Sequence, residues 1–230
     1  MKRLLALAAC LMLAACTTTN AKLAPSTGVS PPPGARIVIV QPDVELGLLT
    51  ASGLTEPRQD WSTQGRDNLL AQYRQVLDAK SHTYTVIDAA TAQGGQVGQM
   101  LRLHQAVGES ILLFQMSGLY ALPTHPAGTL DWTLGDGAKS LADTYHADYA
   151  LFSRAAGNYA SGGRVAMMIG MAALGVSVPL GGQQMYVSLV DLHTGRVVWF
   201  NYAMAGPNAD MRTPAGAASL VTDVMKTAPL

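Results

Sequence analysis

Residues 185–202 read MYVSLVDLHTGRVVWFNY and predict a β-hairpin near the end of the chain. Two runs rich in β-branched and aromatic residues, Met185–Asp191 and Val197–Tyr202, flank a short polar turn. The turn is His193-Thr194-Gly195, in which Gly195 supplies the positive φ that a tight turn requires. The segment therefore contributes two antiparallel strands to the fold.

Upstream of this hairpin, the sequence predicts strands that alternate with helices. Short apolar runs typical of strands are Arg36–Gln41, Thr83–Ile87 and Tyr149–Ser153. Apolar residues at helical spacing predict helices over residues 62–79 and 95–116, with the start of a strand as the alternative for Ile111–Phe114. A short helix is expected over residues 137–145, and Thr213 followed by Pro214 predicts the start of a closing helix. The segments 42–57 and 119–137 are interpreted as loops. This order predicts a single α+β domain, residues 36–230, with a mixed sheet packed with helices.

Residues 1–15 predict a cleaved signal peptide. Met1-Lys2-Arg3 gives a positive start, and an uncharged apolar run of twelve residues follows, ending at Ala15. A membrane-spanning helix needs about 20 such residues, so a permanent span is not expected. The run ends in Leu13-Ala14-Ala15-Cys16, which resembles the bacterial lipobox. This resemblance implies cleavage before Cys16 and transfer of a diacylglyceryl group to its thiol.

A second lipobox match, Leu7-Ala8-Ala9-Cys10, would leave an apolar run of only six residues. Cys16 is therefore the predicted lipidation site. Thr17 follows it, where an aspartate favours inner-membrane retention in enterobacterial lipoproteins. By resemblance, its absence points to an outer-membrane anchor that faces the periplasm. Residues 16–35, rich in Thr, Ser and Pro, are interpreted as a tether between lipid and domain.

The composition argues against several classes of function. The net charge is zero and no basic patch is found, so nucleic-acid binding is not expected. Charged residues make up 13% of the chain, against about 25% in an average domain. A membrane, a partner or copies of the chain are therefore expected to cover part of the surface. With Cys10 removed and Cys16 lipidated, no thiol remains for catalysis or for a disulfide.

No catalytic or cofactor-binding motif is found. The sequence lacks a Gly-x-Ser-x-Gly elbow, a P-loop, a dinucleotide-binding glycine motif and His-Glu-x-x-His, so we expect no enzyme, no cofactor and no metal. Asp143, His146 and Asp148 could hold a metal if the first two share a helical turn. Solvated residues at a helix end are the simpler interpretation. His104 is expected to be satisfied or partly exposed, and His193 to be an exposed turn residue.

The segment Val165–Leu180 carries no charge and reads VAMMIGMAALGVSVPL. As a helix it would reach about 24 Å, short of the roughly 30 Å hydrocarbon core. It also lacks the strict alternation of a membrane-inserting β-hairpin. It is either a membrane or self-association contact, or a buried or partly covered insertion between two strands. The candidate contact residues are Met167, Met168, Ile169, Met171 and Leu174.

Three stretches carry a resemblance to a known group of proteins. They are Ala147-Asp148-Tyr149-Ala150-Leu151-Phe152, the pair Gly162-Gly163, and the segment from Val187 to Trp199. In this order they resemble bacterial envelope lipoproteins related to the curli-secretion lipoprotein CsgG and to the TolB N-terminal-like domain. The resemblance implies the fold, the lipid anchor and an interaction module instead of an enzyme. It supplies no active-site residue, and the group includes a secretion pore.

These observations predict an outer-membrane-anchored periplasmic lipoprotein that acts as a non-enzymatic protein-interaction or envelope-assembly module. Its expected partners are the membrane, through the N-terminal lipid, and other envelope proteins or copies of itself. The alternative is an oligomeric secretion or pore component that uses residues 165–180. A third hypothesis, an envelope hydrolase, would require polar side chains that converge in a pocket.

Overall fold

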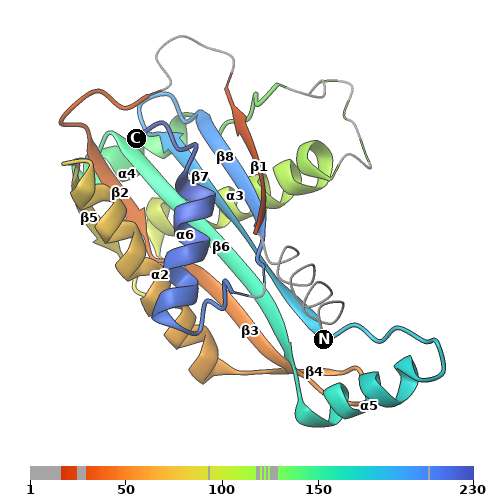
Figure 1. The fold of residues 1–230 in the computed structure, drawn as a ribbon. Helices are drawn as coiled ribbons and strands as arrows, with labels where there is room; N and C mark the ends of the chain where they lie inside the picture. The colour runs from red at the N-terminus through yellow and green to blue at the C-terminus, as the bar shows by residue number, and fades with distance from the viewer. Residues whose placement is uncertain are drawn as a thin grey trace, which may run out of the picture.

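The computed structural model describes residues 17–24, 30–92, 94–117, 120, 122, 124, 129–206 and 208–230. The expected signal peptide, residues 1–15, and Cys16 lie outside them. Within the described residues, one mixed sheet of eight strands is covered by helices on both faces (Figure 1). The single α+β domain predicted from the sequence is confirmed, as are the C-terminal hairpin and the closing helix.

The strands are β1 (Thr18–Leu23), β2 (Arg36–Val40), β3 (Asp43–Leu49), β4 (Thr55–Pro57), β5 (Thr83–Ile87), β6 (Tyr149–Ala160), β7 (Gly181–Asp191) and β8 (Val197–Met204). The helices are α2 (Gln59–Ala79), α3 (Gly95–Ile111), α4 (Lys139–Tyr145), α5 (Gly162–Ala172) and α6 (Pro214–Met225), with a π-helical turn at Leu112–Met116 and a 3-10 turn at Asp136–Ala138. The strands pair in the order β1-β8-β7-β6-β2-β5, and β3 pairs with β6 and β4.

The long strand β6 lies at the centre of the sheet. One of its edges pairs in parallel first with β2 and then, from Arg154 to Ala160, with β3. Its other edge pairs antiparallel with β7 along eleven residue pairs. Between β2 and β3 the ladder is interrupted at Pro42, which has no N–H to donate. β2 and β3 thus run in succession along the same edge of β6.

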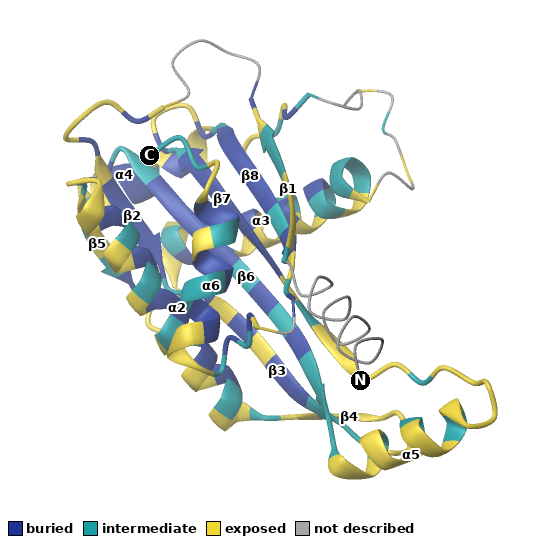
Figure 2. Ribbon diagram, viewed as in Figure 1, coloured by how far each residue is buried: buried dark blue, intermediate teal, exposed yellow. Residues whose placement is uncertain are grey.

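The sheet separates two apolar cores, because successive side chains of a strand point to opposite faces. Ile37 and Ile39 of β2 join the core under α2 and α6. Val38 and Val40 join the core under α3 and α4. Figure 2 shows the central strands as buried between these helix layers. The burial of β2 on both faces explains why its apolar run has no polar face.

The segment expected to be a loop, residues 42–57, instead forms β3 and β4. Polar and apolar residues alternate at the start of β3, and its Val44 and Leu46 are each only 3% exposed. The Leu46 N–H donates to Ser62 Oγ at 2.9 Å, which ties the strand to α2. Gly53, part of the composition that suggested a loop, lies in the turn between β3 and β4 with φ +89°.

The expected tether, residues 16–35, also needs a correction. Thr18–Leu23 is an edge strand that pairs antiparallel with β8 along six residue pairs. Pairing at an edge uses backbone N–H and C=O groups and does not require buried side chains, so a polar, Thr-rich segment can join a sheet. Only residues 24–35 separate this strand from β2.

Gly108 lies within the continuous helix α3 and allows the helix to approach the sheet closely. A Cβ at this position would lie 2.8 Å from ring atoms of Tyr186 in β7. We expect Gly108→Ala to lower the free energy of unfolding by about 1–3 kcal/mol, because the ring or the helix must shift. Urea denaturation measures the change.

Gly170→Ala in α5 is the matched control, because nothing lies within 4 Å of a Cβ there. It should be neutral or stabilising by up to about 1 kcal/mol, since alanine favours the helix. Equal effects of the two substitutions would contradict the close packing of α3 on Tyr186.

Candidate functional site

Residues 161–180 leave the sheet between β6 and β7, and we call this segment the α5 arm. In Figure 1, α5 stands away from the body of the domain, beyond the ends of the two strands. None of its residues is buried, and Figure 2 shows most of the arm as exposed. Of the interpretation as a buried or partly covered insertion between two strands, the structure excludes the buried form and shows partial cover at Met168 and Met171. Whether an element is covered depends on its neighbours in space, which apolar composition alone does not reveal.

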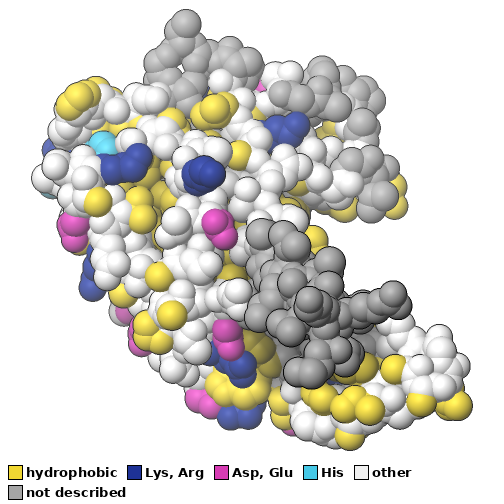
Figure 3. Space-filling view, in the orientation of Figure 1, with side chains coloured by type: hydrophobic (Ala, Val, Ile, Leu, Met, Phe, Trp, Pro, Cys, Tyr) yellow, Lys and Arg dark blue, Asp and Glu magenta, His cyan; other side chains and the backbone are white. Residues whose placement is uncertain are grey.

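The structure exposes three of the five candidate contact residues. Met167 is 41% exposed, Ile169 63% and Leu174 76%, whereas Met168 and Met171 are half-buried. Apolar side chains gather over the arm in the space-filling view (Figure 3). Further exposed apolar residues of this region are Val165, Val176 and Leu180 in the arm and Leu54 in the β3–β4 turn. Leu54 was not predicted from the sequence as a contact residue, because a single leucine in a turn forms no recognisable pattern.

Hydrogen bonds fix the base of the arm to the sheet. Ser161 caps α5 by accepting from Arg164 N at 3.2 Å, and its own N–H donates to Leu49 O at 2.9 Å. Arg164 Nε donates to Pro179 O at 2.9 Å and so joins the two ends of the arm. Gly175, with φ +77°, follows the end of the helix and turns the chain back. The base is thus held while the apolar residues project.

The arm offers apolar surface and little else. Between Val165 and Leu180 the sequence has no charged residue, and its one polar side chain is Ser177. Such a surface can be covered without leaving a side-chain polar group unpaired, so it suits binding and provides no group for catalysis. Among the described residues, no helix combines the length and apolar character that a membrane crossing needs.

A cavity of about 630 Å³ lies where β2 passes into β3, against α3. His104 of α3 lines it and is 5% exposed. The imidazole stacks on Phe152 with ring centroids 3.7 Å apart, and its Nε2 shares a 2.6 Å hydrogen bond with Ser188 Oγ. Burial lowers the pKa of His104 to about 3, so the ring is neutral. Of the two states expected for this histidine, the structure shows the satisfied one.

A serine and a histidine at this distance have the geometry of a nucleophile and its base. Ser188, however, is 0% exposed, and Phe152 covers a face of the imidazole. A substrate could reach the hydroxyl only if the core opened. The pair therefore serves as a satisfied polar link between α3 and β7.

Three charged residues of the cavity lining, Asp43, Asp88 and Arg154, are engaged in contacts within the fold. Arg154 forms ion pairs with Asp43 of β3, with Glu45 at 3.2 Å and with Glu109 of α3 at 3.8 Å. The second acidic residue of the lining, Asp88, accepts a hydrogen bond from Ala90 N at 2.9 Å in its own turn. These contacts tie β6 to β3 and α3, and the arm remains the stronger candidate site.

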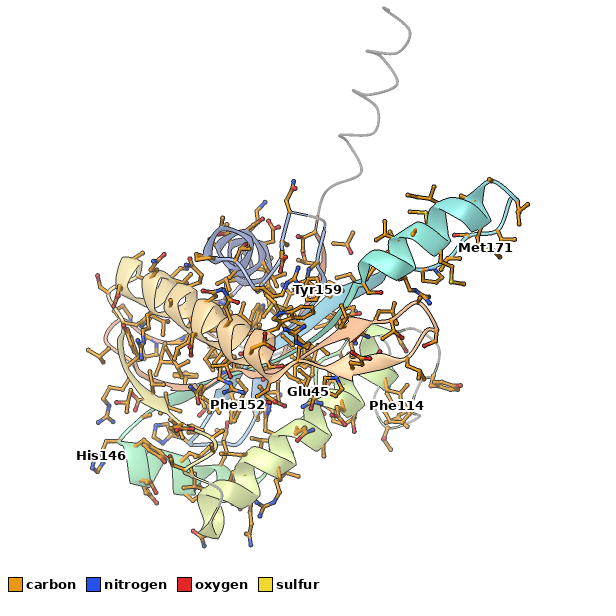
Figure 4. The ribbon with its side chains drawn as sticks, turned by 90° about the horizontal axis from the view of Figure 1, so that it is seen from below. Glu45, Phe114, His146, Phe152, Tyr159 and Met171 are labelled. Carbon is orange, nitrogen blue, oxygen red and sulfur yellow. The ribbon has the colours of Figure 1, made fainter. Side chains whose placement is uncertain are left out.

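Asp143 and His146 line one pocket with Arg36 and His193, the two residues that Asp148 contacts. The Asp148 carboxylate accepts from Arg36 N at 2.8 Å and from Arg36 Nη2 at 3.1 Å, and lies 3.4 Å from His193 Nε2. The hydrogen bond from the Arg36 side chain is the main cause that lowers the pKa of Asp148 to about 2. No three His, Cys, Asp or Glu side chains of the described ranges are grouped to hold a metal ion. Figure 4 shows His146 far from Met171 of the arm.

No family model and no curated protein matches the chain. Among solved structures, it is similar to a PelC dodecamer from Paraburkholderia phytofirmans, with 13% identity and a TM-score of 0.40 over 91% of this chain and 95% of that one. It is also similar to lipoprotein GNA1162 from Neisseria meningitidis, with 18% identity and a TM-score of 0.34 over 84% of this chain and 96% of that one. These likenesses are too distant to assign a family or an activity, and the resemblance to the CsgG group stays a prediction.

Acid should destabilise the fold first through His104. Its pKa is about 3 in the folded protein but about 6.5 in an unfolded chain, so below pH 6.5 the unfolded state binds a proton that the folded state does not. Stability is complete above the unfolded pKa and falls as the pH falls. We expect a loss of about 2 kcal/mol in the free energy of unfolding between pH 6.5 and 4.5, measured by urea denaturation.

The double variant His104→Phe/Ser188→Ala is the control, because it removes the titrating ring together with its hydroxyl partner. Its stability should change much less over this range, and an unchanged slope would contradict the assignment to His104. Asp60, Asp148 and Asp210 have lowered pKa values, and their contributions are lost only below about pH 4.

Proposed function

We propose that the chain is a bacterial envelope lipoprotein, anchored through Cys16 to the periplasmic face of the outer membrane, whose domain works by binding and not by catalysis. The α5 arm is the observation that carries the proposal, because it holds an uncharged apolar surface away from the sheet. The leader and lipobox at residues 1–16 support the anchor. The domain is then an interaction or envelope-assembly module with the arm as its contact surface.

The free energy available at such a surface is large. Covering about 300 Å² of apolar surface would contribute roughly 7 kcal/mol before the cost of association. The methionines at 167, 168 and 171 can adapt their shape to whatever covers them. An arm of this composition is costly in water and useful in a contact, which supports a binding role.

The alternative, an oligomeric secretion or pore component, would use the same arm between copies of the chain. The two functions differ in the mass of the intact lipoprotein purified in detergent. A single copy, or one copy with a different envelope protein, supports the module. A ring of copies that dissociates when the arm is charged supports the alternative.

The anchor is tested by feeding cells an alkyne fatty acid and detecting label on the protein. We expect label on the wild type and on Cys10→Ser, and none on Cys16→Ser, because Cys16 is the residue that follows the full leader. Cys10→Ser is the matched control for the second lipobox. Label that persists on Cys16→Ser would contradict the anchor.

The arm is tested by Ile169→Asp/Leu174→Asp in the full-length protein, with a photo-crosslinker at position 167. Both side chains are exposed, so the free energy of unfolding should stay within about 0.5 kcal/mol of the wild type. The crosslinks formed by the arm in the envelope should disappear, because a charge must be desolvated in any apolar contact.

Leu103→Asp is the matched control for this variant, because Leu103 is a 38% exposed leucine on α3. It should leave the crosslinks of the arm unchanged. If Ile169→Asp/Leu174→Asp also leaves the crosslinks unchanged, the arm is not the contact surface.

A further inference from the structure

We infer that the α5 arm lies in the surface of the same lipid leaflet that holds the Cys16 lipid, so that the domain sits on the membrane through two contacts. The inference rests on the proposed lipid anchor and names the partner of the arm: a lipid surface. It follows from the register of the sheet and from the chemistry of the arm.

The sheet places the start of β1 at the same end as the arm. Thr18 pairs with Met204 of β8, and Met204 pairs with Gln184 of β7. Gln184 in turn pairs with Ala156 of β6, four residues before that strand ends at Ala160 and the arm begins. At about 3.3 Å per residue, Thr18 lies only about 13 Å from the base of the arm along the strand direction.

No linker of several residues separates Cys16 from the sheet. The hydroxyl of Thr17 accepts a hydrogen bond from Gly206 N at 3.3 Å, so this residue is already held by the domain. Cys16 precedes it directly, and consecutive Cα atoms lie about 3.8 Å apart. A lipid on Cys16 therefore brings this end of the sheet against the membrane. Met204, beside Thr18, adds an apolar side chain that is 57% exposed at the same end.

The chemistry of the arm fits lipid better than protein. Protein interfaces carry about one hydrogen bond per 100–200 Å² and a polar rim that selects the partner. Residues 165–180 have one polar side chain, Ser177, and thus little with which to select a protein. Lipid tails need no such groups. The eleven residues of α5 span about 16 Å, well short of a roughly 30 Å hydrocarbon core, so the arm would enter only one leaflet, tip first.

Arg164 is the single charged residue of the arm and stands at its base. Its Nε is bound to Pro179 O, which holds the guanidinium beside the point where the arm leaves the sheet. This is the depth at which lipid phosphates would meet a cation when the apolar residues are inserted. The order of groups, apolar at the tip and cationic at the base, is that of a membrane-surface element.

The second contact would fix how the domain is oriented. A lipid on one residue leaves the domain free to pivot about Thr17, whereas a lipid and an arm at the same end do not. The β7–β8 turn, residues 192–196, then faces away from the membrane, because β7 runs from the arm to that turn. Figure 4 shows the tip of the arm, at Met171, and His146 at opposite ends of the molecule.

The test uses the mature lipoprotein in vesicles of phosphatidylethanolamine and phosphatidylglycerol, at a high ratio of lipid to protein. Leu174→Cys supplies a single thiol for an environment-sensitive fluorophore, since Cys10 leaves with the leader and Cys16 carries lipid. Thr194→Cys is the matched control, because Thr194 is also exposed and follows the end of β7, and that end lies about 33 Å from the start of the strand.

Nitroxide lipids should quench the fluorophore at position 174 several-fold more strongly than the fluorophore at position 194. The emission of the fluorophore at position 174 should also shift to the blue. Adding Ile169→Asp should remove most of this difference.

Equal and weak quenching at the two sites would overturn the inference, because the arm would then lie in water. A fluorophore at position 174 that neither iodide nor nitroxide lipids quench would mean that protein covers the arm. This result would also overturn the inference. A parent protein that takes label without an added cysteine has a free thiol at Cys16. That result would overturn the anchor and with it the proposed function, while quenching at 174 would still report on the arm.

Discussion

β6 is hydrogen-bonded along both edges, to β2 and β3 on one side and to β7 on the other. Both faces of this strand are also covered, with Leu151 and Ala155 in the core under α2 and α6, and Ala150 and Phe152 in the core under α3 and α4. A slip of one residue would exchange these two sets and bury Arg154 on the wrong face. Burial on both faces therefore allows β6 one register.

That register passes through β7 and β8 to β1, and it determines where the ends of the chain segments lie. The position of Thr17 relative to the α5 arm is thus set by ladder hydrogen bonds and not by a flexible linker. At the opposite end, Asp148 N donates to Arg36 O at 2.8 Å, and the two side chains form an ion pair. The pair is partly exposed, so its contribution to stability is modest, but it closes the β2–β6 edge.

Sequence patterns predicted the elements marked by an apolar run, such as β2 and β5, by helical spacing, such as α2 and α3, or by a turn between two runs, such as the β7–β8 hairpin. They missed β1 because its partner, the edge of β8, lies far along the chain and its own side chains stay largely exposed. β3 was missed although Asp43, Val44, Glu45 and Leu46 alternate, because the flanking Pro and Gly suggested a loop. The uncharged character of residues 165–180 was readable from the sequence; their exposure was not, since it depends on what packs against them.

The two helices rich in Ala and Gly show why that exposure matters. α6 buries Leu220, Val221 and Val224 against the sheet and α2, and turns polar residues such as Thr222 outward. α5 has a comparable length and no polar face after Arg164, yet no buried residue. A helix that is apolar all round is normally found where something covers it. The described residues of the domain leave α5 uncovered, which supports a covering surface from outside the fold, and the sheet register puts the proposed membrane anchor at that end of the molecule.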